Sequence, residues 1–257
     1  MFLSSASIKE QILNNIKIRK SRYKAKKFIA YFQSFSNTYA DINILKQQYD
    51  EAVSAHPDIV GLNISTRPDC IDEAKIQLIA SYRKKVPFVC IEYGLQSCHN
   101  KTLELINRKE TFEDFLKALQ LTKKYKDSLH HCVHVILGLP EESFEEQMKT
   151  AAILADLRIE GIKIHPLAVM QNTPLADLYE KSLYIPLSAE EYLSSACSFI
   201  ERLHPECIIH RVSTAGHPMH TIAPAWLKEN KSNLTRAIEE EFRKRKTQQG
   251  SLYKKTL

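Results

Sequence analysis

Short apolar segments alternate with amphipathic segments along most of this chain of 257 residues. Helical periodicity occupies residues 41–55, 72–85, 111–126, 143–157 and 188–203. Six apolar segments have the length of β-strands: residues 28–32, 59–65, 88–94, 132–138, 162–167 and 207–212. Strand–helix units that recur at roughly 30-residue spacing are typical of βαβ crossovers. The sequence therefore predicts an α/β fold with a parallel sheet.

The strand segments are nearly continuous runs of apolar residues, as expected when both faces of a parallel sheet are covered. There is no GxGxxG motif, which disfavours a Rossmann domain, so a barrel or partial barrel is predicted. After residue 170 the pattern becomes a loop, a helix and a loop, then the last strand and a C-terminal helix. We therefore predict a barrel core over residues 1–170 and a mostly helical extension over 171–257.

Two strand segments end in polar turns, FVCIEYGLQS (88–97) and HCVHVILGLPEES (131–143). In parallel α/β proteins the chemistry lies at the carboxyl ends of the strands, so these turns are predicted to line a site. Ser143 with Glu146 three residues later forms a helix start signal. Arg67 and Asp69 predict a turn that caps a helix beginning near Ile71.

Composition narrows the class of protein. The hydrophobic share of 44% and the charged share of 26% are ordinary for a globular protein. No apolar run approaches the roughly 18 residues of a membrane span, and we expect a cytoplasmic protein. The six cysteines form no CxxC pair, which argues against a disulfide framework and a zinc ribbon.

The net charge of +6 is concentrated at the two ends of the chain. Residues 17–27 contain seven basic residues in eleven, and residues 242–246 contain four in five. Such segments can contact nucleic-acid phosphates, and they also occur as solvated helix faces.

Several segments, taken in order, carry a resemblance to a known family. STRPD (65–69), IEYGLQS (91–97), INR (106–108), ILGLPEES (136–143) and IKIHPL (162–167) resemble the radical S-adenosylmethionine (radical SAM) superfamily. Within it, the chain is similar to a bacterial family related to the Elongator catalytic subunit and to oxygen-independent coproporphyrinogen oxidase. The resemblance implies a partial (β/α)6 TIM-like barrel that holds a [4Fe-4S] cluster and S-adenosylmethionine (SAM). A reductant such as flavodoxin or ferredoxin would drive cleavage of SAM to a 5′-deoxyadenosyl radical.

The resemblance also implies roles for single residues. Gln96 matches the position that hydrogen-bonds the SAM ribose, and Arg108 matches the position that pairs with the methionyl carboxylate. A guanidinium fork suits a carboxylate better than an ammonium group does. Glu92 is either a second polar contact in the mouth of the barrel or the partner of a basic side chain.

Three further residues are assigned to the adenine side of SAM. Gly138 belongs to a turn that lets the backbone approach adenine, Ile136 would pack on the ring, and the backbone near His165 would contact it. The sequence departs from the related oxidases at His134, where they carry an acidic residue, and at Ser65, where they carry a glutamate.

The family holds its cluster with three cysteines in a CxxxCxxC loop, placed just upstream of a segment like residues 2–12. From the resemblance we expect this chain to lack the first strand, the loop and the cluster ligands. We then expect residues 28–32 to form a sheet edge that invites association, and the chain alone to be inactive.

Two other functions remain open. A metal-dependent barrel hydrolase could use His134, His165 and His210, although no HxH or HExxH spacing supports it and we predict no metal ligand. A non-catalytic RNA-binding protein could use the basic ends, which fits the kinship with enzymes that act on tRNA, although no known RNA-binding module is present.

Overall fold

The computed structural model describes residues 6–213, 220–228 and 232–254. The start of the predicted segment 2–12 therefore lies outside the described residues. The chain forms two compact units. The first unit comprises Met1–Gly94 and Glu113–Cys132, and the second comprises Leu95–Phe112 and Val133–Leu257.

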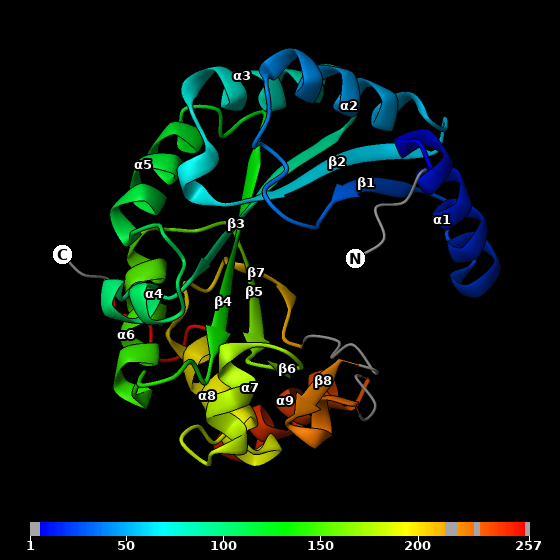
Figure 1. Cartoon of the computed structure of the whole chain (residues 1–257). Coiled ribbons are helices and arrows are strands. Elements are labelled where there is room, and N and C mark those ends of the chain that lie inside the picture. The colour runs from blue at the N-terminus through cyan, green and yellow to red at the C-terminus, as the bar shows by residue number, and fades with distance from the viewer. Residues whose placement is uncertain (1–5, 214–219, 229–231, 255–257) are drawn as a thin grey trace. The chain divides into compact units, whose positions relative to one another are not determined.

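The first unit holds the helices and strands from the beginning of the chain (Figure 1). Its helix α2 packs on β2, and α1 packs on α2. The elements are α1 (Ile8–Tyr23), β1 (Phe28–Phe32), α2 (Ile42–Ser54), β2 (Ile59–Thr66), α3 (Glu73–Ser81), most of β3 (Phe88–Gln96) and most of α5 (Phe112–Lys123).

The second unit holds the later elements, and β4 (His130–Leu137) begins in the first unit and ends in the second. Helix α8 packs on both α6 and α9. The elements are α4 (Asn100–Leu105), α6 (Phe144–Asp156), β5 (Gly161–Pro166), β6 (Val169–Met170), α7 (Pro174–Glu180), α8 (Ala189–Arg202), β7 (Ile208–Arg211), β8 (Thr221–Ala223) and α9 (Ser232–Arg245).

The six predicted strands are all present and form one sheet in the order β1-β2-β3-β4-β5-β7. The pairs β1/β2, β2/β3 and β5/β7 are parallel. Strands β6 and β8 form a separate antiparallel pair that the sequence did not predict. They span two and three residues, which is too short for a period-2 pattern to be seen.

Buried aromatic side chains anchor helices to strands in each unit. In the first unit Tyr49 of α2 is fully buried, and its hydroxyl donates a hydrogen bond of 2.7 Å to the Asn37 carbonyl oxygen. In the second unit the buried Tyr192 of α8 donates to the Val212 carbonyl oxygen at 2.7 Å. These side chains fill the core and satisfy backbone groups at strand ends.

One predicted helix start is confirmed and one is wrong. Ser143 and Glu146 form a reciprocal capping box at the start of α6. Helix α3, by contrast, begins at Glu73 and is capped by Asp72, whose carboxylate accepts from the Lys75 backbone N–H at 2.9 Å. Asp69 is two residues into a 3-10 turn that Pro68 starts, so it is too early in the chain to cap α3. Among the described helices, none combines the length and apolarity needed to cross a membrane.

Candidate functional site

In the first unit, a buried carboxylate is surrounded by hydrogen-bond donors. Glu92 of β3 has no exposed surface. The Tyr31 hydroxyl donates to its Oε2 at 2.6 Å, and Asn63 Nδ2 donates to its Oε1 at 2.6 Å. The Oδ1 atom of Asn63 is also buried and has no hydrogen-bond partner. The Tyr31 hydroxyl of β1 and the Asn63 amide of β2 therefore both hold the Glu92 carboxylate, and the two roles that the sequence offered for Glu92 stay predictions.

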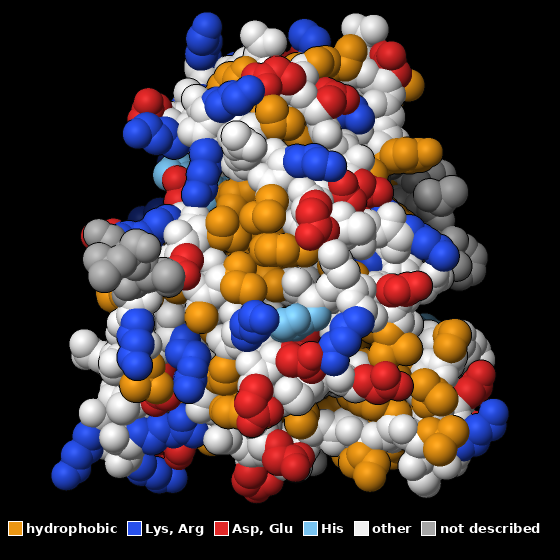
Figure 2. All heavy atoms as spheres, turned by 90° about the vertical axis from the view of Figure 1, so that its left-hand side faces the viewer, with side chains coloured by type: hydrophobic (Ala, Val, Ile, Leu, Met, Phe, Trp, Pro, Cys, Tyr) orange, Lys and Arg blue, Asp and Glu red, His pale blue; other side chains and the backbone are white. Residues whose placement is uncertain are grey.

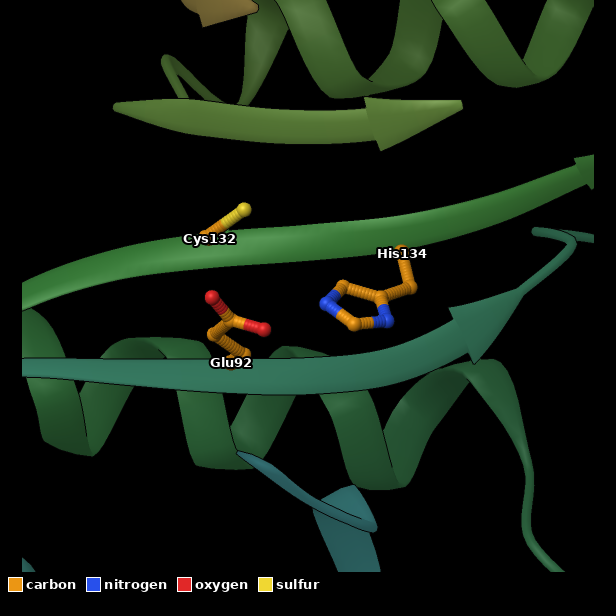
Figure 3. Close-up of side chains that lie close together, drawn as sticks. All are labelled: Glu92, Cys132 and His134. Atoms are coloured by element: carbon orange, nitrogen blue, oxygen red, sulfur yellow. The ribbon is translucent and has the colours of Figure 1, made fainter. Parts of the chain in front are cut away.

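The Cys132 side chain of β4 lies beside the Glu92 side chain (Figure 3). The Cys132 Sγ atom and a carboxylate oxygen of Glu92 lie within 4.8 Å of each other, and both residues are buried. His134 follows two residues later on β4, so its side chain leaves the strand on the same face as Cys132. The hydrogen bonds from Tyr31 and Asn63 fix the orientation of the Glu92 carboxylate, and each of its oxygens can accept a further bond.

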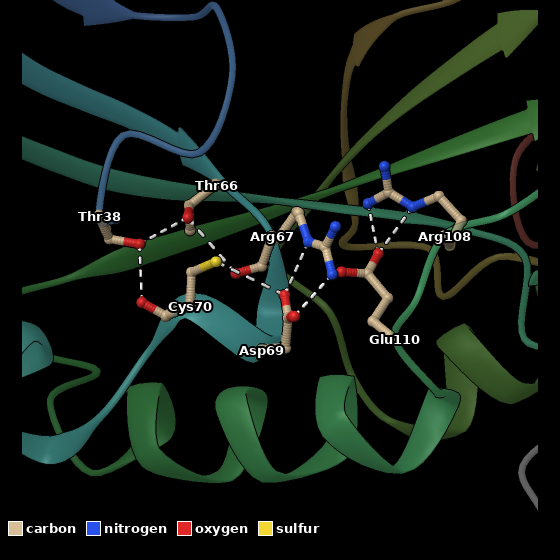
Figure 4. Close-up of polar contacts among 7 residues, drawn as sticks. All are labelled: Thr38, Thr66, Arg67, Asp69, Cys70, Arg108 and Glu110. Carbon is tan, nitrogen blue, oxygen red and sulfur yellow. Dashed lines mark hydrogen bonds and ion pairs between the residues drawn. The ribbon is translucent and has the colours of Figure 1, made fainter. Parts of the chain in front are cut away.

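The first unit also contains a polar turn after β2 (Figure 4). Arg67 donates to both carboxylate oxygens of Asp69, at 2.8 Å from Nε and 2.6 Å from Nη2. Thr38 and Thr66 share a hydrogen bond of 2.6 Å, and Thr38 Oγ1 also donates to the Cys70 carbonyl oxygen. The turn predicted at Arg67 and Asp69 is confirmed, and its polar groups satisfy one another.

In the second unit, the turn that carries Gln96 is strained. Gln96 ends β3 with φ at +72°, a conformation that side-chain-bearing residues rarely adopt. The next residue, Ser97, is buried, and its hydroxyl donates to Oε1 of Glu142. The His99 backbone N–H donates to Ser97 Oγ at 3.0 Å. The Gln96 turn is thus joined to the turn between β4 and α6, where burial raises the pKa of the Glu142 carboxyl.

Arg108 is held by a carboxylate from its own loop. Its Nε donates to Glu110 Oε1 at 2.8 Å, and its Nη2 contacts the same oxygen (Figure 4). The Arg108 side chain is 23% exposed and that of Glu110 is 2% exposed. The predicted guanidinium is therefore present on the same 95–112 segment as Gln96, in an orientation set by Glu110.

Gly138 occupies the turn at the end of β4 with φ at +85°. A Cβ atom here would lie 3.0 Å from the Leu187 side chain, and the Tyr184 hydroxyl donates to the Gly138 carbonyl oxygen at 2.7 Å. Position 138 therefore requires glycine for two reasons: its φ is positive, and a Cβ atom would come too close to the Leu187 side chain. Ile136, two residues earlier on β4, is half-buried.

The His165 ring of β5 has a buried nitrogen that makes no hydrogen bond. Its Nδ1 atom is buried and has no hydrogen-bond partner. Burial lowers the pKa of His165 to about 3, and the nearby His134, Arg211 and Lys163 lower it in the same direction. The His134 and His165 rings meet edge to face, with centroids 5.5 Å apart. An unprotonated nitrogen without a partner suits a ligand that donates a hydrogen bond.

The three histidines that a metal-dependent hydrolase could use do not all lie in one group. His134 and His165 are neighbours, but His210 is exposed on β7, and no set of three histidines gathers within the described ranges. A zinc hydrolase needs three protein ligands around one ion.

The cysteines do not fit a [4Fe-4S] cluster held by three thiolates. Five of the six are buried, and burial raises the pKa of Cys197 to about 11 and that of Cys207 to about 12. Within the residues that the structure describes, no three cysteine sulfurs come together. Cluster iron prefers thiolates, which raised pKa values disfavour. The expectation that the ligands are absent from this chain stays a prediction.

The polar groups of the second unit have the hydrogen-bonding chemistry that suits SAM. This ligand carries an ammonium group, an exocyclic amine and hydroxyls that can donate, together with a carboxylate that can accept. The second unit offers the Gln96 amide, the Arg108 guanidinium and the unpartnered acceptor of His165.

Comparisons with known proteins place the chain in a family. A sequence model of the Radical SAM superfamily matches residues 5–154, and one of the Radical_SAM C-terminal domain matches residues 159–244. The uncharacterized protein MJ0486 of Methanocaldococcus jannaschii is 38% identical over 96% of this chain and 75% of its own length. The uncharacterized protein YtqA of Bacillus subtilis is 36% identical over 91% of this chain and 71% of its own length. This chain therefore belongs to the radical SAM superfamily.

More distant relatives include the tRNA uridine(34) acetyltransferase of Methanocaldococcus jannaschii, 28% identical over 65% of this chain and 30% of its own length. Among solved structures, an archaeal Methanocaldococcus infernus Elp3 with an N-terminal deletion superposes with a TM-score of 0.78 at 20% identity. The match covers 93% of this chain and 59% of the Elp3 chain, so this chain spans less than two thirds of it. The likeness confirms the predicted α/β fold, a TIM-like partial (β/α)6 barrel of parallel strands.

Several polar residues of the candidate site, Glu110 among them, were missed by sequence reasoning. Tyr31 and Asn63 lie inside apolar strand segments, where they could be told apart only as polar exceptions. Ser97 and Glu142 lie in the two polar turns that were predicted to line a site. Their position in those turns is a signal that could have identified Ser97 and Glu142. No sequence pattern indicates the hydrogen bond between them.

Proposed function

We propose that this chain binds S-adenosylmethionine and takes part in radical SAM chemistry on a substrate. The observation that carries the proposal is that most of the candidate residues lie in the second unit, two of them in turns that a hydrogen bond joins. Of the six residues expected to contact SAM, all but Glu92 belong to that unit: Gln96, Arg108, Ile136, Gly138 and His165. There the turns of Gln96 and Gly138 are joined by the hydrogen bond between Ser97 and Glu142.

The proposed roles follow from the chemistry of each group. Gln96 hydrogen-bonds the ribose, and Arg108, oriented by Glu110, pairs with the methionyl carboxylate. Ile136 packs on adenine, and the backbone at Gly138 and near His165 approaches the same ring. Glu92 belongs to the first unit, where hydrogen bonds from Tyr31 and Asn63 fix its carboxylate, and its contact with SAM stays a prediction.

In the radical SAM superfamily, a [4Fe-4S] cluster and a reductant such as flavodoxin or ferredoxin would drive the cleavage of SAM to a 5′-deoxyadenosyl radical. The described residues do not gather the thiolates of a cluster, so no step of that cleavage is assigned to them. Their proposed part is to bind and orient SAM.

We further propose that the substrate is an RNA. Two features support this substrate class: the relative named tRNA uridine(34) acetyltransferase, and the basic segment 17–27, which forms the end of α1 and the loop after it. A non-catalytic RNA-binding role would rest on the same segment, without SAM binding.

Isothermal titration calorimetry with S-adenosylhomocysteine tests the proposal without requiring a cluster. We expect saturable binding at one site. Arg108→Ala and Gln96→Ala should each weaken it by about tenfold, which is the loss of one charge-assisted or buried hydrogen bond. Arg83→Ala, which removes an exposed arginine of the first unit, is the control. No binding by the folded wild-type chain, or equal losses in all three variants, would contradict the proposal.

A further inference from the structure

Helix α1 and the loop after it carry a positive charge that the rest of its unit hardly neutralises. Residues 17–27 contain seven basic residues and no acidic one. Asp58 is the one carboxylate of the described residues that pairs with them, at 3.1 Å from Lys20 and 3.2 Å from Lys27. Lys17, Lys24 and Lys26 are exposed and have no carboxylate partner among the described residues. A field of this kind attracts polyanions.

An exposed aromatic ring lies within this charge. Tyr23, the last residue of α1, is 56% exposed. The guanidinium carbons of Arg19 and Arg22 lie 5.6 Å and 5.2 Å from the centre of its ring. Aromatic and guanidinium planes at a basic surface are the groups on which unpaired bases stack, while lysines contact the phosphates.

A lipid surface is the other polyanion that a basic helix can bind, and α1 is a poor match for it. Membrane-surface helices present one broad apolar face to the lipid. In α1 the apolar residues Ile8, Ile12 and Ile16 follow one another at four-residue spacing and are buried or half-buried. Leu13 and Ile18 are the exposed aliphatic residues of the helix, and they stand among polar neighbours.

We propose that residues 17–27 form an RNA-docking surface, in which Lys17, Lys24 and Lys26 contact the phosphate backbone and Tyr23, with Arg19 and Arg22, stacks on an unpaired base. This inference rests on the proposed RNA substrate, and it names where on the chain that RNA is held. The surface lies on the first unit, so it is separate from the residues proposed to bind SAM in the second.

Helix α9 provides a matched control, because it is the other basic segment of the chain. Its cations are paired with its own carboxylates: Arg236 with Glu240 at 2.9 Å, Arg243 with Glu239 at 3.8 Å and Lys244 with Glu241 at 3.9 Å. Removing three positive charges from residues 17–27 and removing three from α9 change the net charge of the protein by the same amount.

The test is fluorescence anisotropy with a labelled tRNA transcript and a labelled single-stranded RNA, at several salt concentrations. The phosphate variant is Lys17→Gln with Lys24→Gln and Lys26→Gln. The α9 control is Arg236→Gln with Arg243→Gln and Lys244→Gln. We expect the phosphate variant to lose at least about tenfold in affinity for both RNAs and to lower the salt slope by about two to three. The control should change affinity by less than about twofold.

Tyr23→Ala separates stacking from charge. We expect it to weaken binding of the single-stranded RNA by about tenfold and to leave the salt slope unchanged. Circular dichroism of each variant checks that the protein is folded, and S-adenosylhomocysteine calorimetry on the same samples should give wild-type affinity. Calorimetry and anisotropy thus show separately whether the protein binds the SAM analogue and whether it binds RNA.

Three outcomes would overturn the proposal. The first is equal losses in the phosphate variant and the α9 control, which would mean that net charge alone acts. The second is absence of RNA binding by the folded wild-type chain. The third is tighter binding to vesicles containing phosphatidylserine than to either RNA, which would assign the surface to a membrane instead.

Discussion

Helices α1 and α9 are both basic in sequence, yet their cations have different surroundings. In α9 each of Arg236, Arg243, Lys244 and Arg245 has a carboxylate within 4.0 Å, mostly from the same helix. In residues 17–27 the three exposed lysines and the two arginines around Tyr23 have no carboxylate partner in the part of the chain that the structure describes. The two basic segments therefore differ in how far carboxylates neutralise them, and we propose that the cations of residues 17–27 contact a partner.

Arg245 is the clearest case of a cation used for structure. It donates to Glu241 at 2.9 Å and to Ser198 Oγ of α8 at 3.0 Å, and it lies 3.6 Å from the buried Glu201. Its side chain is 22% exposed and that of Glu201 is 6% exposed. These contacts join α9 to α8.

The largest effect is expected from removing this side chain. We expect Arg245→Ala to lower the free energy of unfolding by about 2 kcal/mol, because it leaves the Glu201 carboxylate buried with fewer donors. Arg22→Ala in α1 should cost less than about 0.5 kcal/mol, as is usual for exposed sites. Urea denaturation measures both. Equal costs would show that the α1 arginine is also structural.

A carboxylate introduced into α1 should make it resemble α9. Ser21→Glu places an acid four residues after Lys17 and three before Lys24, which is the spacing of helical ion pairs. We expect RNA affinity to fall about fivefold, since a negative charge is added and two cations are engaged. Ser21→Gln is the neutral control, and anisotropy is the measurement. An unchanged affinity for Ser21→Glu would place the RNA elsewhere.

Removing the Asp58 carboxylate is the converse of adding a carboxylate at position 21. Hydrogen bonds from Lys20 and Lys27 hold the pKa of Asp58 below its ordinary value. Asp58→Asn should release both lysines and raise RNA affinity about twofold. Because the folded-state pKa is lowered, the stabilising pair exists above the unfolded pKa of about 3.9 and is lost as pH falls through the folded value. Any loss of stability in Asp58→Asn should thus be present at pH 7 and disappear in acid.

Glu142 is a carboxylate whose pKa moves the other way, because burial dominates over the hydrogen bond from Ser97. A raised folded-state pKa makes stability greatest below the unfolded pKa of about 4.3 and lower as pH rises through the folded value. Glu142→Gln keeps an oxygen that accepts from Ser97 and does not ionise. We expect its melting temperature to exceed that of the wild type by about 2 °C at pH 7 and to match it near pH 4. A pH-independent difference would argue against a buried, ionising carboxyl.

Much of the fold could be predicted from the sequence because its signals are local. The six apolar segments became the six strands of the main sheet, and the Ser143–Glu146 signal became the capping box of α6. Local signals also failed where they compete: Asp69 and Asp72 are both acidic residues before α3, and Asp72 caps the helix while Asp69 lies in the preceding 3-10 turn.

The site could be predicted only in part. Gln96 and Arg108 were found through family motifs, and their surroundings were not. Arg108 depends on Glu110, and Gln96 on a bond between Ser97 and Glu142, which are 45 residues apart in the chain. The Tyr31–Glu92 hydrogen bond joins residues 61 apart. Contacts at such separations have no periodicity or spacing that one sequence can display. The ion pairs that distinguish α9 from α1 are different, because their i,i+3 and i,i+4 spacing can be seen in the sequence.

Photochemical cross-linking of radiolabelled SAM to the intact chain, followed by peptide mapping, tests the central claim most directly. The account predicts saturable labelling that S-adenosylhomocysteine competes away, on peptides containing Gln96–Arg108 or Ile136–His165. Labelling that does not saturate, or that is confined to peptides of α1 and β1, would contradict it.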